Sequence, residues 1–165
     1  MATERLTLEI VTPEGVQLSV EVDEFTAPSV RGQFGVLPGH RPMLASLATG
    51  LISYIPGGGG EEDQVAVGPG HVQLEAGEAV VLTERFALKG SVDPVTVRRE
   101  LKEVDQALEA FSGDFESAPH AELVARELWA AALLELYGDP PPPTMRGFRE
   151  TPPPHDHMQQ ASDES

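Results

Sequence analysis

Residues 6–22, LTLEIVTPEGVQLSVEV, alternate apolar and polar side chains on both sides of a short central segment. That segment, TPEG at residues 12–15, combines proline, an acidic residue and glycine, which is the chemistry of a tight turn. Alternation with a period of two indicates strands that bury one face. The sequence therefore predicts a β-hairpin near the start of the chain.

Similar short runs continue up to about Lys89, separated by segments rich in glycine and proline. They lie at residues 51–55, 64–67, 71–75 and 79–84. Many short strands at this spacing favour an antiparallel β-sandwich or barrel. We expect residues 1–90 to form a β-sandwich domain.

The spacing of the apolar residues changes after Asp93. Asp93 is the expected N-cap of a helix, and Pro94 is its expected first residue. Apolar residues then recur at spacings of four and three as far as Phe111. Residues 112–114 break this helix, and a second is predicted from about residue 120 to residue 137, with Gly138 as its stop. Its expected apolar face comprises Leu123, Val124, Leu128, Leu133, Leu134 and Tyr137. The fold class is therefore α+β, with an antiparallel two-helix hairpin over residues 91–138.

Residues 139–165 contain two proline blocks, at 140–143 and 152–154, among acidic and other polar residues. Such a composition buries too little apolar surface to order itself, so we expect a disordered, Pro-rich acidic tail. His155, Asp156 and His157 offer two imidazoles to a metal ion, but the tail lacks further ordered ligands. We expect no metal site.

The charge balance narrows the classes of partner. The chain has 165 residues, with 27 acidic and 11 basic ones, and its net charge of −16 repels phosphate backbones and anionic lipid. We therefore expect no nucleic-acid partner, and contact with a membrane only through other proteins. The absence of cysteine excludes disulfides, thiolate zinc sites and cysteine nucleophiles. We expect no secretory signal. The longest apolar run, residues 128–134, is far shorter than the about 20 residues that a membrane-spanning helix needs.

Three features invite a catalytic or ligand-binding interpretation. Residues 57–60 are four glycines, but no Lys-Ser or Lys-Thr follows them, and the next three residues are acidic. We expect the tip of a flexible hairpin there. His40 and His71 are candidate general bases for a hydrolase, although no G-x-S-x-G motif accompanies them. We expect neither a catalytic residue nor a cofactor.

Residues 32–43, GQFGVLPGHRPM, carry the most specific pattern. Their glycines permit positive φ angles, and their prolines stiffen the loop. The pattern resembles the signature of the epsilon subunit of F-type proton-translocating ATP synthases, which is the delta subunit in mitochondria. Further similarity at residues 8–15, 47–50, 65–68 and 80–82 extends it over roughly residues 5–138.

This resemblance implies a sandwich of about ten strands followed by two helices. It implies a non-catalytic subunit of the rotor's central stalk that binds the gamma subunit and the polar loops of the c-ring, and so couples proton flow to ATP synthesis. The implied location is the cytoplasmic face of the bacterial inner membrane, as a peripheral protein. A free-standing sandwich that binds partners through a helical adaptor is the alternative.

Two departures from the family pattern bear on the sites. Some bacterial relatives bind ATP through Ile/Leu-Asp-x-x-Arg-Ala, whereas here Thr96 stands at the arginine position and only Asp93 remains. We therefore expect weak ATP binding or none, unless Arg98 or Arg99 substitutes. Gln33 replaces the acidic residue that faces the c-ring in several relatives, so the partner interface is expected to use Arg31, Gln33 and His40.

In bacterial relatives the hairpin opens and docks its second helix on the β subunit, inhibiting ATP hydrolysis. Residues 92–138 contain ten acids and four bases, a net charge of 4 − 10 = −6. Docking on an acidic partner segment would favour a basic helix, so we expect a hairpin that mostly stays folded and inhibits weakly.

Overall fold

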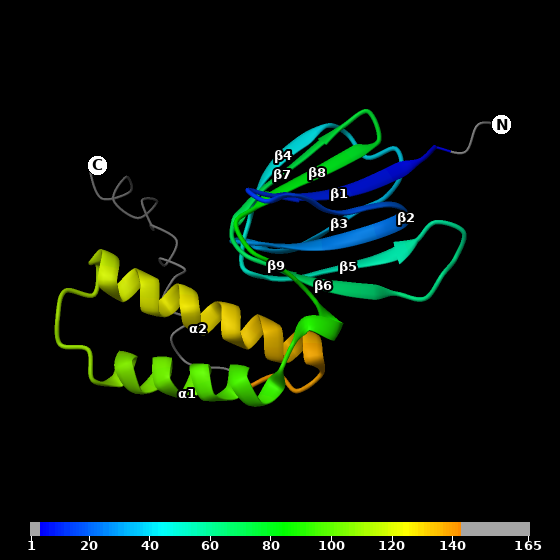
Figure 1. Ribbon diagram of the computed structural model, residues 1–165. Helices are drawn as coiled ribbons and strands as arrows, with labels where there is room; N and C mark the ends of the chain where they lie inside the picture. The colour runs from blue at the N-terminus through cyan, green and yellow to red at the C-terminus, as the bar shows by residue number, and fades with distance from the viewer. Residues whose placement is uncertain (1–3, 143–165) are drawn as a thin grey trace, which may run out of the picture.

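The computed structural model describes residues 4–142 (Figure 1). Of the predicted disordered tail at residues 139–165, the structure describes residues 139–142, which line a groove beside the first of the two helices rather than extending freely. The remaining residues of the tail, with His155, Asp156 and His157, lie outside the described part of the chain. The described strands are β1 (Leu6–Thr12), β2 (Gly15–Ser29), β3 (Gly32–Val36), β4 (Met43–Leu47), β5 (Gly50–Pro56), β6 (Asp63–Val67), β7 (Gly70–Glu75), β8 (Glu78–Thr83) and β9 (Phe86–Leu88). A 3₁₀ turn, η1 (Lys89–Ser91), leads to the helices α1 (Pro94–Glu109) and α2 (Ala118–Tyr137).

The nine strands form one continuous hydrogen-bonded sheet that is folded into two layers (Figure 1). Its order is β4-β7-β8-β1-β2-β5-β6-β9, and β3 pairs with β2 outside this path. The first half of β2 pairs with β1, and its second half pairs with β5 and β3. A register shift between Val22 and Glu24 lies where β2 passes from one layer to the other.

The predicted α+β fold, a sandwich followed by a helical hairpin, is confirmed. Residues 6–22 form the expected hairpin, and Leu6, Leu8 and Ile10 are buried. The described strands number nine rather than about ten, because β2 continues through the bulge as a single strand of 15 residues. β1 and β8 pair in parallel, whereas the other ladders are antiparallel. Strands far apart in sequence can pair in either direction, because no tight hairpin forces them to run antiparallel.

The core of the sandwich comes from alternate residues of both layers. Phe25 is the largest of the fully buried side chains. The other members of this cluster are Leu6, Leu8, Ile10, Val22, Ala27, Val36, Leu47, Ile52, Tyr54, Val65, Val67, Val72, Leu74, Ala79 and Val81. Gly70 is required where β7 meets β8, since a Cβ there would overlap the carbonyl oxygen of Leu82.

Part of the outer face of β5, β6 and β9 is also covered. Leu51 lies opposite Ala66, and Ala66 lies opposite Ala87, so three apolar side chains form a row across the strands. This row packs against Leu133, Leu136 and the half-buried Trp129. Helix α2 therefore covers this part of the sheet, and β6 is buried on both faces at its end.

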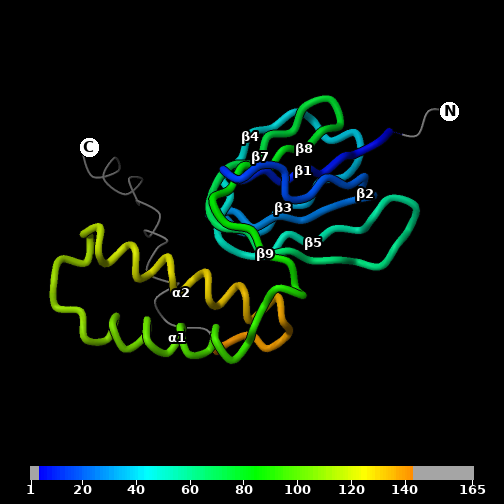
Figure 2. Tube along the Cα trace, viewed as in Figure 1, coloured from blue at the N-terminus to red at the C-terminus, as the bar shows by residue number. Residues whose placement is uncertain are grey.

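Helix α2 lies between the sandwich and α1, and the two helices run antiparallel (Figure 2). Val97 of α1 packs against Ala130 and Leu134 of α2. Asp93 accepts a hydrogen bond from the backbone N–H of Val95, which confirms the expected N-cap. Neither helix of residues 4–142 is both long and apolar enough to span a membrane.

The predicted apolar face of α2 is wrong in part. Leu128 and Tyr137 are exposed, at 36% and 43% of their surface, whereas Ala130, Ala132 and Leu136 are buried. A single stripe assumes one buried side, but α2 is covered by the sheet on one side and by α1 on another. Alanine also allows close helix packing while adding little to an apolar pattern.

Replacing Leu136 with alanine should lower the free energy of unfolding by about 2–5 kcal/mol, because a side chain with 2% exposure leaves a cavity. The matched change Leu128→Ala, on the exposed side of the same helix, should cost less than about 1 kcal/mol. Urea denaturation followed by the fluorescence of Trp129 measures both. Equal losses from the two substitutions would contradict this packing.

Candidate functional site

The glycine- and proline-rich motif at residues 32–43 forms β3 and the loop that follows it. Phe34 and Val36 pack on the core, opposite Ala27 and Phe25 of β2. Within residues 4–142, no strand pairs with the second edge of β3. The motif therefore builds an edge strand that is fixed to the core on one side and open on the other.

The turn between β2 and β3 presents Arg31 and Gln33, which are both exposed. The Ser29 hydroxyl donates to the carbonyl of Gly32 at 2.6 Å and accepts from the backbone N–H of Arg31 at 3.1 Å. Gln33 is the next residue after Gly32 and lies opposite Pro28 of β2. The turn is thus held by its own hydrogen bonds, and Arg31 and Gln33 stand exposed two positions apart at its end.

His40 lies beyond the other end of β3, in a second turn. Its backbone N–H donates to the carbonyl of Leu37 at 3.1 Å, and its Nδ1 lies 2.8 Å from the carbonyl oxygen of Arg41. Gly39 has φ of 82° and passes against the side chain of Glu4. Four residue steps along β3, about 13 Å, separate the two turns. Arg31 and Gln33 therefore share one region, and His40 belongs to another.

Exposed apolar side chains flank this edge, and the sequence pattern did not predict them. Val30 is 67% exposed and Leu37 58%. Large apolar groups exposed beside polar ones are typical of protein–protein contact surfaces. The available signal was their position next to turn residues, where no alternation assigns them to a buried face.

A groove of about 290 Å³ on the sheet surface includes Gln33 in its wall. Glu24 and Glu62 also line it, so its rim is acidic. Burial, together with the charge of Asp63 and the 3.1 Å hydrogen bond to its carboxylate, raises the pKa of Tyr54 at this groove. Tyr54 therefore remains a neutral donor at physiological pH.

The four glycines at residues 57–60 connect β5 and β6, as expected of a hairpin tip. The backbone N–H groups of Gly58 and Gly59 donate to the carboxylate of Asp23 at 3.3 and 2.9 Å. A carboxylate of the chain itself occupies the donors that a phosphate would need. The glycines therefore form a closed turn that Asp23 stabilises.

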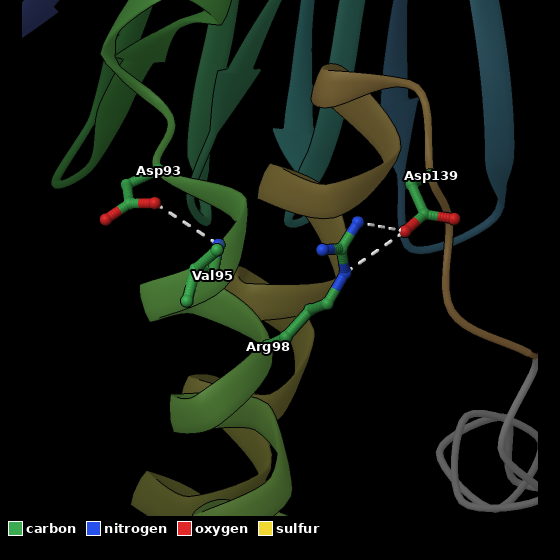
Figure 3. A network of polar contacts seen from close by, with 4 residues as sticks. All are labelled: Asp93, Val95, Arg98 and Asp139. Carbon is green, nitrogen blue, oxygen red and sulfur yellow. Dashed lines mark hydrogen bonds and ion pairs between the residues drawn. The ribbon is translucent and has the colours of Figure 1, made fainter.

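Asp93 is engaged within the first turn of α1 (Figure 3). Its carboxylate accepts from the N–H of Val95 at 3.2 Å and from the hydroxyl of Thr96 at 2.6 Å. The hydrogen bond from Thr96 is the main cause of the lowered pKa of Asp93, supported by backbone N–H groups and by the nearby charge of Arg99. Arg98, a candidate phosphate ligand, instead binds Asp139.

The remaining candidates lie apart from one another. His71 is exposed on β7, between Ser46 of β4 and Leu82 of β8. His40 lies in the loop between β3 and β4. Within residues 4–142, no three histidine or acidic side chains gather closely enough to hold a metal ion.

Comparison with known sequences gives the family. The profile described as "ATP synthase, Delta/Epsilon chain, beta-sandwich domain" matches residues 5–89. The ATP synthase epsilon chain of Anaeromyxobacter dehalogenans strain 2CP-1 is 38% identical over 133 residues, which are 81% of this chain and 98% of that one. This chain belongs to the ATP synthase epsilon chain family. The epsilon chain of Geotalea uraniireducens is 36% identical over 69% of this chain and 81% of its own length.

Solved structures show the same fold as this epsilon-family chain. A chain of the Euglena gracilis mitochondrial ATP synthase assembly of OSCP, F1 and c-ring aligns with a TM-score of 0.62 at 19% identity, covering 83% of this chain and 79% of that one. A chain of the Tetrahymena thermophila mitochondrial ATP synthase central stalk and c-ring aligns with a TM-score of 0.54 at 12% identity, covering 83% and 99%. The family assignment thus confirms the resemblance carried by residues 32–43.

Substituting Asp93 with asparagine should flatten the acid side of the stability profile. The folded pKa of Asp93 is lowered, so its contribution is complete above the ordinary value of 3.8 and is lost as pH falls below it towards the folded pKa. Asparagine also caps helices but does not titrate. The difference in unfolding free energy between wild type and Asp93→Asn should therefore shrink in this window, measured by urea denaturation at stepped pH.

Glu100→Gln, an exposed change on the same helix, is the control for general loss of negative charge. A difference between wild type and Asp93→Asn that stays constant from neutral pH to below 3.8 would show that the carboxylate does not stabilise the helix through its charge.

Proposed function

We propose that this chain is a central-stalk subunit of an F-type ATP synthase that links the gamma subunit to the c-ring. Membership of the epsilon family over 81% of the chain is the observation that carries the proposal. The chain would transmit rotation between proton flow and ATP synthesis, without an active site or cofactor of its own. It would reach the membrane through its partners, as a peripheral protein at the cytoplasmic face of a bacterial inner membrane.

The β3 edge and its flanking turns are the proposed contact surface. Arg31 and Gln33 would meet the polar loops of the c-ring from the β2–β3 turn, and His40 would make a separate contact from the opposite end of β3. The exposed Val30 and Leu37 add apolar area beside each turn. Because Gln33 offers hydrogen bonds but no charge, the ionic part of the contact would rest on Arg31.

The sandwich, residues 1–90, would act as the unit that binds the rotor, and the hairpin of residues 91–138 as a separate regulatory unit. Two features support weak inhibition of hydrolysis through the β subunit. The hairpin has a net charge of 4 − 10 = −6. In addition, opening it would expose Val104 and Leu134, which are now buried.

Arg31→Ala should weaken binding to a purified complex of gamma subunit and c-ring by roughly 5-fold, as expected for one solvent-screened charge contact. Arg99→Ala, an equal change of charge on α1, should leave the affinity unchanged. Titration of the full-length chain by calorimetry measures both. A folded wild-type chain that fails to bind would contradict the stalk function, whereas equal affinities of the two variants would contradict only the role of Arg31.

Stopping the chain after Gly90 should raise ATP hydrolysis by the assembled complex by less than about 2-fold, because an acidic hairpin gains little from an acidic partner segment. The comparison uses complexes reconstituted with the full-length and the shortened chain. Since shortening uncovers Leu51 and Ala66, circular dichroism must first show that the sandwich is folded. A several-fold rise would show that apolar docking outweighs the charge mismatch.

A further inference from the structure

The segment that follows α2 turns back onto α1. Gly138 has φ of 106°, and its N–H donates to the carbonyls of Leu134 and Glu135 at 3.1 Å each. The N–H of Asp139 donates to the carbonyl of Leu134 at 2.9 Å. These bonds close the end of α2 and fix the backbone from which the Asp139 side chain extends.

Asp139 binds α1 through Arg98 (Figure 3). The Nε of Arg98 donates to Oδ2 of Asp139 at 3.1 Å, and Nη2 contacts the same oxygen. The two residues are 41 positions apart in the sequence, so the pair joins the first turns of α1 to the chain beyond α2. Their side chains are 49% and 58% exposed, which leaves the ion pair open to screening by salt.

Three prolines continue from Asp139 along α1. Residues 140–142 form one wall of a groove of about 460 Å³, and Leu101 and Leu134 form part of its apolar lining. Pro141 is half-buried. A proline run is already restricted to an extended conformation, so holding it against the helix costs little conformational entropy.

The other charges along this groove are mixed in sign. Lys102, Asp105 and Glu109 line it farther along α1, so one cation and two acids follow Arg98. A carboxylate that moved along the groove would meet repulsion from these acids. The charge pattern therefore favours the position at Arg98.

We propose that residues 139–142 form a clasp that holds the end of α2 against α1 and biases the helical hairpin towards its closed state. The Arg98–Asp139 ion pair joins α1 to the chain just after α2, and the rigid proline run keeps the Asp139 carboxylate in place. Because this ion pair is half-exposed, it stabilises the closed hairpin less as the ionic strength rises. The clasp is a property of the isolated chain, whereas its effect on ATP hydrolysis rests on the function proposed above.

Hydrogen exchange of the full-length chain, followed by mass spectrometry, tests the clasp. Arg98→Gln and Asp139→Asn should each speed exchange of peptides from residues 94–104 and 130–137 by about 2- to 5-fold, as expected for an exposed ion pair. The double variant should exchange no faster than either single one, since both remove the same contact. Peptides from β1 should not change.

Two control variants carry the same changes of charge elsewhere: Arg41→Gln in the loop after β3, and Glu122→Gln on the exposed surface of α2. Neither should alter exchange of the hairpin. Addition of 1 M sodium chloride should bring the wild type close to the Asp139→Asn variant while leaving that variant nearly unchanged. Wild-type exchange that is insensitive to salt would overturn the proposal.

Equal exchange in the Arg98 and Asp139 variants and the controls would also overturn the clasp, as would additive effects in the double variant. If a single variant also loses protection in β1, its effect is not confined to the hairpin. The reversed pair, Arg98→Asp with Asp139→Arg, then tests whether the ion pair itself is responsible. Recovery of wild-type protection in the reversed pair supports the clasp, and failure to recover it overturns the clasp. None of these outcomes depends on whether the chain binds a rotor.

Discussion

A row of small and branched apolar side chains on the outside of the sheet holds the two parts of the fold together. Leu51, Ala66 and Ala87 lie in register on β5, β6 and β9, and α2 packs its Leu136 against them. Alanine at the centre lets the helix come close to the strands. Once α2 is fixed there, α1 has an apolar surface to pair with, and the chain after Gly138 emerges beside the first turns of α1.

The sequence predicted the features that depend on local chemistry. Alternation located the strands of the first hairpin, and Asp93 with Pro94 located the start of α1. The α2 stop at Gly138 followed from the same kind of signal. The buried face of α2 could not be predicted in this way, because it depends on two surfaces that meet the helix from different directions. Leu128 was placed inside for that reason and lies outside.

The sequence predicted which segment forms the candidate site, but not how the residues of that segment are arranged in space. Residues 32–43 stood out through their glycines and prolines, yet only the strand between the two turns shows that Arg31 and His40 lie apart. Contacts between distant residues had no local signal. Asp23 closes the glycine turn from 35 and 36 positions away, and Arg98 meets Asp139 across the whole hairpin.

The long strand β2 also has a mechanical meaning. Its first half is bonded to β1 and its second half to β5 and β3, so one uninterrupted backbone belongs to both layers. Sliding one layer over the other would require hydrogen bonds on both halves to break together, in shear, rather than one after another. A torque applied to one layer would therefore reach the other through a covalent chain, and the sandwich would turn as a stiff block.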